Sequence, residues 1–193
     1  MPGVFLCLRF IPLCQNGGMT RNTVLSPIDT PPAFELTLSL RLAGLDLVVS
    51  VHTTAQALVG IEFNPQRPSG GSSSTPRGRV AEDAGRQLQR YAEDPEWRFS
   101  LPLQTRGTPF QQRLWDALRG IPPGRHQTYG QLARALNSAP RAVGQACRRN
   151  PVPIVVPCHR VLAAGGVGGF AGASAGEKLD IKRALLAHEG WEG

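Results

Sequence analysis

The sequence predicts an α+β fold, with a small strand-rich N-terminal domain followed by a mostly helical C-terminal domain. Apolar and polar residues alternate strictly over residues 34–40, as they do in a half-buried strand. In the second half, residues 108–111 and 128–131 both read Thr-x-x-Gln, the capping box that begins a helix. The chain has 193 residues, which suffice for one domain or two small ones with an ample core.

Further elements of the first half follow from its periodicity. Residues 45–51 and 57–63 are strand candidates, and the turn-like residues 52–54 would join them. The segment RPSGGSSSTPRGR has the composition of a flexible loop. Apolar residues then recur at helical spacing over residues 80–91, so one helix is expected to complete this domain.

The predicted organisation has an extension and two domains. We expect a disordered or misassigned extension over residues 1–30, an N-terminal domain over 31–103 and a C-terminal domain over 104–193. The apolar start is interrupted by Arg9 and lacks the charge and cleavage site of a signal peptide. Because no apolar run approaches membrane-spanning length, we expect no membrane association.

Helices dominate the prediction for the second half. A first helix begins with Pro109 at its first position and ends at the Gly/Pro-rich residues 120–124. A short helix from Thr128 to Leu136 and a basic helix over 140–149 form a helix-turn-helix candidate, although a plain three-helix bundle would give the same capping signals. A last helix, begun by a capping box at 174–177, runs to Glu189.

Positive charge is concentrated in the second half. The net charge is +7, yet residues 1–103 hold nine basic and nine acidic side chains, whereas residues 104–193 hold twelve and five. A basic excess confined to one domain is typical of nucleic-acid binding. The alternative is a solvated surface rich in arginine. Together with the helix-turn-helix candidate, the asymmetry favours nucleic acid.

The segment PVPIVVPCHRV, residues 151–161, places a thiol and an imidazole directly behind an apolar run typical of a buried strand. A thiolate nucleophile needs a base within reach and a group that orients the base. His159 is adjacent to Cys158, and Glu189 could supply the orienting carboxylate. The competing interpretation is a structural cysteine in the core, which is commoner than a reactive one.

This segment, together with RAVGQACRRN, GTPFQQRLW and TYGQLA, resembles the methylated-DNA–protein-cysteine methyltransferases over about residues 101–190. The resemblance implies a ribonuclease H-like N-terminal domain and a winged-helix-like DNA-binding element. It also implies single-turnover repair of O6-alkylguanine after base flipping, with O4-alkylthymine as a further candidate substrate. The PCHRV core is the most specific of these motifs.

The resemblance also implies roles for individual residues. Cys158 corresponds to the alkyl acceptor, His159 to the base that deprotonates it through a water, and Glu189 to the carboxylate that orients the histidine. Asn150 corresponds to the asparagine that braces the active-site turn.

Other positions resemble the family's residues that bind substrate and DNA. Tyr129 matches the tyrosine that binds the flipped base and helps to protonate the leaving guanine, and Arg141 matches the finger that replaces the extruded nucleotide. Phe170 and Gly172 match an aromatic lid position and a glycine that leaves room for the alkyl group. The neighbouring arginines expected to contact substrate or DNA are Arg148, Arg149 and Arg160.

The chemistry requires no cofactor, because the protein itself accepts the alkyl group. Cys7, Cys14 and His52 show no metal-ligand spacing, so we expect no metal. The expected partner is double-stranded DNA, bound by a monomer, and sparse cysteines favour a reducing, cytoplasmic setting. Two alternatives remain: a lesion sensor of the same fold that does not repair, and a turnover cysteine hydrolase or redox protein.

Overall fold

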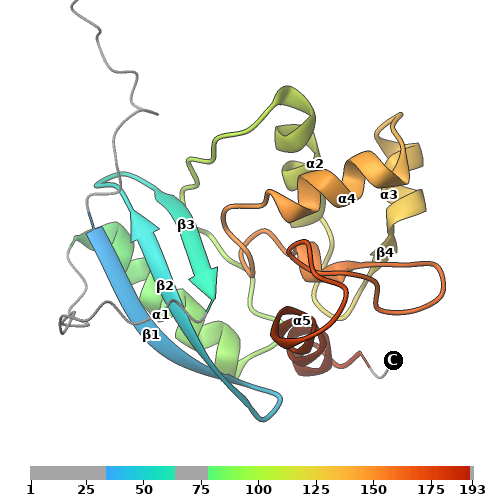
Figure 1. Cartoon of the computed structure of the whole chain (residues 1–193). Helices are drawn as coiled ribbons and strands as arrows, with labels where there is room; N and C mark the ends of the chain where they lie inside the picture. The colour runs from blue at the N-terminus through green and yellow to red at the C-terminus, as the bar shows by residue number, and fades with distance from the viewer. Residues whose placement is uncertain (1–33, 64–77, 192–193) are drawn as a thin grey trace, which may run out of the picture.

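A three-stranded antiparallel sheet carries the N-terminal half of the computed structural model, which describes residues 34–63 and 78–191 (Figure 1). Its strands lie in chain order: β1 (Phe34–Leu42), β2 (Leu45–Thr53) and β3 (Leu58–Phe63). Helix α1 (Arg79–Glu93) packs on this sheet and turns its apolar side toward it. The predicted alternation is confirmed, because the alternate residues Leu36 and Leu40 of β1 are buried.

The connection between β2 and β3 differs from the prediction. Strand β2 continues through Thr53, so the tight turn spans residues 54–57 rather than the predicted residues 52–54. It closes where the Thr54 amide donates to the Ala57 carbonyl at 2.8 Å, while the Thr54 hydroxyl accepts the Ala57 amide at 3.0 Å. The predicted extension, most of the Gly/Ser-rich loop, and both Cys7 and Cys14 lie outside the described residues.

The second half is helical, and both of its predicted capping boxes form. Thr108 and Gln111 cap one helix reciprocally, and Thr128 and Gln131 cap another. The elements in order are α2 (Pro109–Arg119), β4 (Gln127–Thr128), α3 (Tyr129–Ala135), α4 (Pro140–Arg148), the 3-10 helix η2 (Cys158–Arg160), β5 (Val161–Leu162) and α5 (Glu177–His188). Helices α3 and α4 pack against each other, as a helix-turn-helix requires.

Two local predictions are wrong. The apolar run at residues 154–156 is a series of turns rather than a strand, and Ile154 has a positive φ of 72°. The alternating prolines at 151, 153 and 157 remove the amide donors that a strand would need. The capping box at 174–177 does not form either, because the N-cap of α5 is Gly176, which has no side chain to accept a backbone amide.

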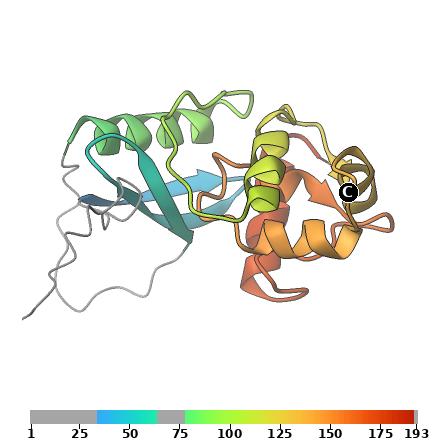
Figure 2. The ribbon, with the colours of Figure 1, turned by 90° about the horizontal axis from the view of Figure 1, so that it is seen from above.

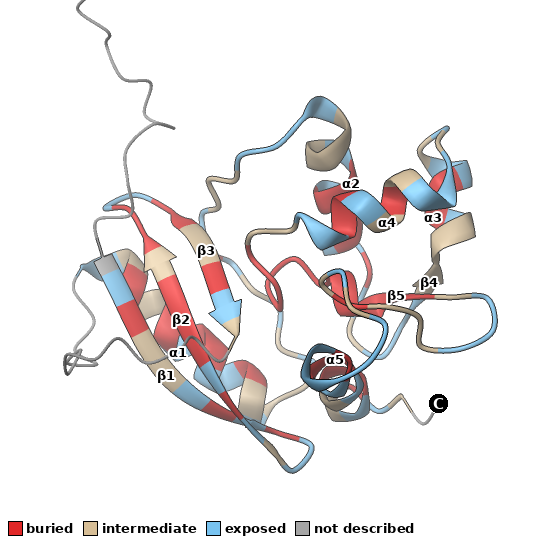
Figure 3. Cartoon of the chain, viewed as in Figure 1, coloured by how far each residue is buried: buried red, intermediate tan, exposed pale blue. Residues whose placement is uncertain are grey.

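The two halves lie side by side and contact each other at several points (Figure 2). The Gln104 amide donates to the Leu58 carbonyl at 3.0 Å, and the Ile61 amide donates to the Pro151 carbonyl at 2.9 Å. Buried side chains from both halves belong to one hydrophobic cluster, as the distribution of buried residues in Figure 3 indicates. Strand β3 is thus packed directly against the turn that precedes Cys158.

Candidate active site

A pocket of about 310 Å³ opens between α4, α3 and the loop of residues 163–176. Five residues predicted to belong to the site line it: Tyr129, Arg148, Cys158, Phe170 and Gly172. The pocket therefore gathers a thiol, a phenol and an aromatic side chain from segments that are far apart in the sequence.

Cys158 begins η2, and only 6% of it is exposed. The Asn150 amide nitrogen donates to the Cys158 sulfur at 3.2 Å and to the Val156 carbonyl at 2.8 Å. The Asn150 side-chain oxygen accepts the Val152 amide at 3.0 Å, so this one side chain ties both ends of the turn. Burial raises the pKa of the Cys158 thiol, while the Asn150 hydrogen bond and the Lys182 ammonium partly oppose that rise.

His159 is completely buried, and its Nε2 lies 2.9 Å from Glu189 Oε1. A carboxylate can only accept, so Nε2 carries the ring proton and the Nδ1 lone pair is free. Nδ1 has no hydrogen-bond partner in the described part of the chain. Burial lowers the pKa of His159 and outweighs the opposing effect of Glu189, so the ring stays neutral and Nδ1 can accept a proton.

Glu189, the C-cap residue directly after α5, is the centre of a buried hydrogen-bond network. The Arg160 guanidinium donates to both of its oxygens, from Nε to Oε2 at 2.9 Å and from Nη2 to Oε1 at 2.8 Å. The Tyr91 hydroxyl donates to Oε1 at 2.8 Å. Burial alone would raise the pKa of Glu189, but the donors His159 and Arg160 outweigh burial and hold this pKa well below its usual range.

The position of Arg160 does not favour its predicted contact with substrate or DNA, which stays a prediction. Only 6% of the residue is exposed, and its guanidinium also donates to the Ile121 carbonyl. The guanidinium has five N–H donors, and Glu189 and this carbonyl occupy three of them. Its structural place is beside the carboxylate that holds His159.

Arg141, Arg148 and Arg149 are exposed on α4. Arg141 lies in the first turn of that helix, where the unpaired backbone amides add positive potential. Arg148 overlies Gly172, whose φ is 85°, and a Cβ at that glycine would overlap the arginine side chain. Arg148 thus borders the pocket, whereas Arg141 and Arg149 lie outside its lining.

The loop of residues 163–176 closes one side of the pocket. The Tyr129 hydroxyl donates to the Gly169 carbonyl of this loop at 3.2 Å, and burial raises the pKa of Tyr129 above its ordinary value. Phe170 is buried, and its ring centroid lies 5.9 Å from that of Phe63 in β3. The predicted lid residue is therefore held from the N-terminal half.

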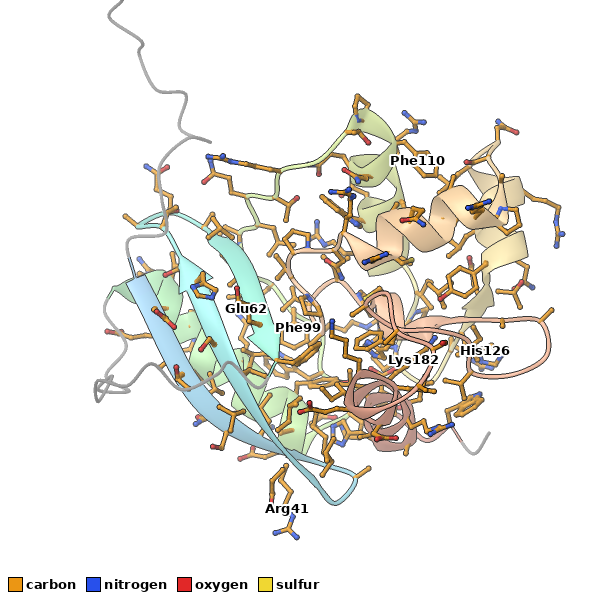
Figure 4. All side chains as sticks on the ribbon, in the orientation of Figure 1. Arg41, Glu62, Phe99, Phe110, His126 and Lys182 are labelled. Atoms are coloured by element: carbon orange, nitrogen blue, oxygen red, sulfur yellow. The ribbon has the colours of Figure 1, made fainter. Side chains whose placement is uncertain are left out.

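The sequence did not indicate two buried polar residues at the site, Tyr91 and Lys182. The Lys182 ammonium donates to the carbonyls of Val161, Val167 and Gly169 at 2.7, 2.6 and 3.1 Å, where α5 meets the loop (Figure 4). Burial lowers its pKa to about 8. The only sequence signal was its place on the apolar side of α5, three residues after Leu179 and three before Leu185.

Residues 34–63 and 78–191 contain no cluster of three or more His, Cys, Asp and Glu side chains that could hold a metal ion. No helix within these ranges has the length and apolar character needed to cross a membrane.

The comparisons with known proteins agree on one family. The family profile of the 6-O-methylguanine DNA methyltransferase, DNA binding domain, matches residues 109–191. The constitutive methylated-DNA–protein-cysteine methyltransferase of Bacillus subtilis is 48% identical over 106 residues, which span 54% of this chain and 62% of that protein. The Mycolicibacterium paratuberculosis protein of the same name is 39% identical over 153 residues, 78% of this chain and 85% of its own.

The fold comparison agrees. The crystal structure of Mycobacterium tuberculosis OGT in complex with DNA superposes with a TM-score of 0.62 at 31% identity, covering 80% of this chain and 91% of that one. The structure of the Mycobacterium tuberculosis O6-methylguanine methyltransferase gives a TM-score of 0.61 at 31% identity. The similarity therefore extends beyond the helical half into the sheet.

Proposed function

The chain belongs to the methylated-DNA–protein-cysteine methyltransferase family, and on that premise we propose that it repairs DNA by moving the alkyl group of O6-alkylguanine irreversibly to its own Cys158. The observation that carries this proposal is the Cys158 thiol, held by Asn150 inside the pocket with the His159–Glu189 pair next to it. O4-alkylthymine is a further substrate under the same proposal.

The proposed transfer is a displacement at the alkyl carbon. His159 Nδ1 takes the thiol proton through a water, and the sulfur forms a bond to the alkyl carbon as the bond from that carbon to guanine O6 breaks. The electron pair stays on the guanine, which Tyr129 protonates and which remains in the DNA strand as the repaired base. The thioether has no second nucleophile to release it, so each molecule acts once.

A base inside a duplex cannot present its O6 substituent to a thiol that is 6% exposed, so the nucleotide must leave the stack. We propose that α4 enters the DNA with Arg141, which fills the place of the flipped nucleotide, while Arg148 and Arg149 contact phosphates. Both predicted units, residues 31–103 and 104–193, would contribute to repair, and the second unit would bind the DNA.

A reducing, cytoplasmic setting fits this proposal, because the nucleophile must stay a thiol. Cys147 and Cys158 are both free cysteines.

The mass of the intact protein tests the proposed transfer. After incubation with duplex DNA that carries O6-methylguanine, the protein should gain the mass of one methyl group per molecule, and peptide mapping should locate it on Cys158. Binding to the lesion without any gain in mass would favour the non-repairing sensor instead. Repeated product release by one molecule would favour a turnover hydrolase.

Arg141→Ala tests the flipping role. We expect this variant to repair duplex DNA roughly tenfold more slowly or worse, because flipping costs a few kcal/mol that the inserted side chain offsets. Its reaction with free O6-benzylguanine, which needs no flipping, should keep the wild-type rate. Arg41→Ala is the matched control, since Arg41 is an exposed arginine at the far end of β1 (Figure 4). Equal losses on both substrates would contradict the flipping role.

A further inference from the structure

Tyr91 brings the N-terminal half into the hydrogen-bond network of the site. It belongs to α1 and is 0% exposed, and its hydroxyl donates to Glu189 Oε1 at 2.8 Å across 98 positions of sequence. The ring is fixed between Phe99, at 5.5 Å, and His188, at 5.0 Å between ring centroids. Figure 4 shows Phe99 between the sheet and α5.

The same carboxylate oxygen serves Tyr91 and His159. Oε1 accepts the Tyr91 hydroxyl at 2.8 Å and the His159 ring nitrogen at 2.9 Å, together with one Arg160 nitrogen at 2.8 Å. Each donor draws negative charge toward itself, so the Tyr91 bond reduces the charge that Glu189 presents to the imidazole. Burial, followed by the Glu189 charge, raises the pKa of Tyr91 well above its ordinary value, so the hydroxyl keeps its proton.

We propose that Tyr91 is a positioning residue for alkyl transfer, through which the N-terminal half donates a hydrogen bond to Glu189 and limits the basicity of His159. This inference rests on the function proposed above and adds to it a contribution from a helix outside the matched DNA-binding domain, residues 109–191.

Tyr91 is one of several residues of the N-terminal half that contact the site. The Ile61 amide of β3 donates to the Pro151 carbonyl, within the turn that leads to Cys158. Phe63, also of β3, packs on Phe170 in the loop over the pocket. The N-terminal half thus touches the turn, the loop and the Glu189 carboxylate.

The direction of the expected change in the pKa of His159 follows from the groups that surround His159 and Glu189. Arg160 and Cys158 of η2 and Lys182 and His188 of α5 face this network, with Tyr91 from α1. In Tyr91→Phe every one of these charges remains, and Arg160 still holds both carboxylate oxygens. The carboxylate therefore stays in place but presents more charge to His159, which stabilises the imidazolium and raises the pKa of His159.

The test is the pH dependence of single-turnover alkyl transfer from free O6-benzylguanine, which avoids any effect on DNA binding. His159 works as a base only when neutral, so the rate falls as the pH drops through its pKa. We expect Tyr91→Phe to move this acid limb to higher pH by roughly half a pH unit. The plateau rate should stay within roughly threefold of the wild-type rate.

Phe99→Leu is the control, because it alters one side of the packing around the Tyr91 ring and keeps the tyrosine hydroxyl. Its acid limb should coincide with that of the wild type, and circular dichroism should show both variants folded. The inference would be overturned if the acid limb of Tyr91→Phe did not shift, or if that of Phe99→Leu shifted equally. In either case the wild type would still gain its alkyl group, so the proposed function would stand. A wild type that gains none would overturn the proposed function as well.

Discussion

Cys158→Ala should abolish alkyl transfer completely while the protein still binds DNA that contains O6-methylguanine. The sulfur is the only atom of this side chain that can form the thioether, so no residual pathway is expected. Binding should survive, because it depends on α4 and the pocket walls, which remain. Asn150 loses one of its partners in this variant but keeps its hydrogen bonds with Val156 and Val152.

The chain offers a close control in Cys147. This second buried cysteine lines the same pocket, and burial raises the pKa of its thiol, but its neighbours in the chain are Ala146 and Arg148 rather than a histidine. Cys147→Ala should therefore transfer at the wild-type rate. Mass spectrometry of the intact protein, with a gel-shift assay for binding, measures both properties. Alkyl label on Cys147 in the wild type, or transfer by Cys158→Ala, would refute Cys158 as the acceptor.

Glu189→Gln should slow alkyl transfer by roughly 10²- to 10⁴-fold, the usual contribution of a positioned base. A glutamine can offer its amide N–H₂ to His159, which would then place the ring proton on Nδ1 and remove the lone pair that receives the thiol proton. The neutral amide also leaves the buried Arg160 charge without its counter-ion. We expect a further loss of roughly 3–5 kcal/mol in the free energy of unfolding.

Single-turnover rates and thermal melting separate these two effects. Transfer should be slow well below the melting temperature of the variant, and lesion binding should persist there. His188→Ala is the neighbouring control, since the His188 ring bonds to the Tyr91 carbonyl at 2.7 Å rather than to His159. Wild-type transfer by folded Glu189→Gln would remove Glu189 from the mechanism.

Local signals in the sequence predicted much of the fold correctly. Alternation at 34–40 and the capping boxes at Thr108 and Thr128 act between residues that are close in the chain, so their geometry could be inferred without tertiary structure. The apolar run at 154–156 was wrongly predicted to be a strand, because the neighbouring prolines determine the backbone conformation there. The Ser174 box failed because Gly176, which has no side chain, is the N-cap of α5 instead.

The site residues that could be predicted from the sequence are those that lie within a recognisable motif. The pairing of His159 with Glu189 was available from the resemblance, and the structure brings the two side chains together. The burial of Arg160 was not predictable, because an arginine beside a cysteine looks the same in sequence whether it faces DNA or a carboxylate. Tyr91 and Lys182 take their partners from other elements, which no local pattern reveals.

The long sequence separation within the Glu189 network links reactivity to folding. The network joins residues 91 and 189, which are 98 positions apart, and residues 159 and 189, which are 30 apart. Contacts between such distant segments form only after large loops have closed, at an entropic cost that slows them. A partly folded chain therefore carries Cys158 without an oriented base. Titration with alkyl donor would then count only molecules whose folding is complete.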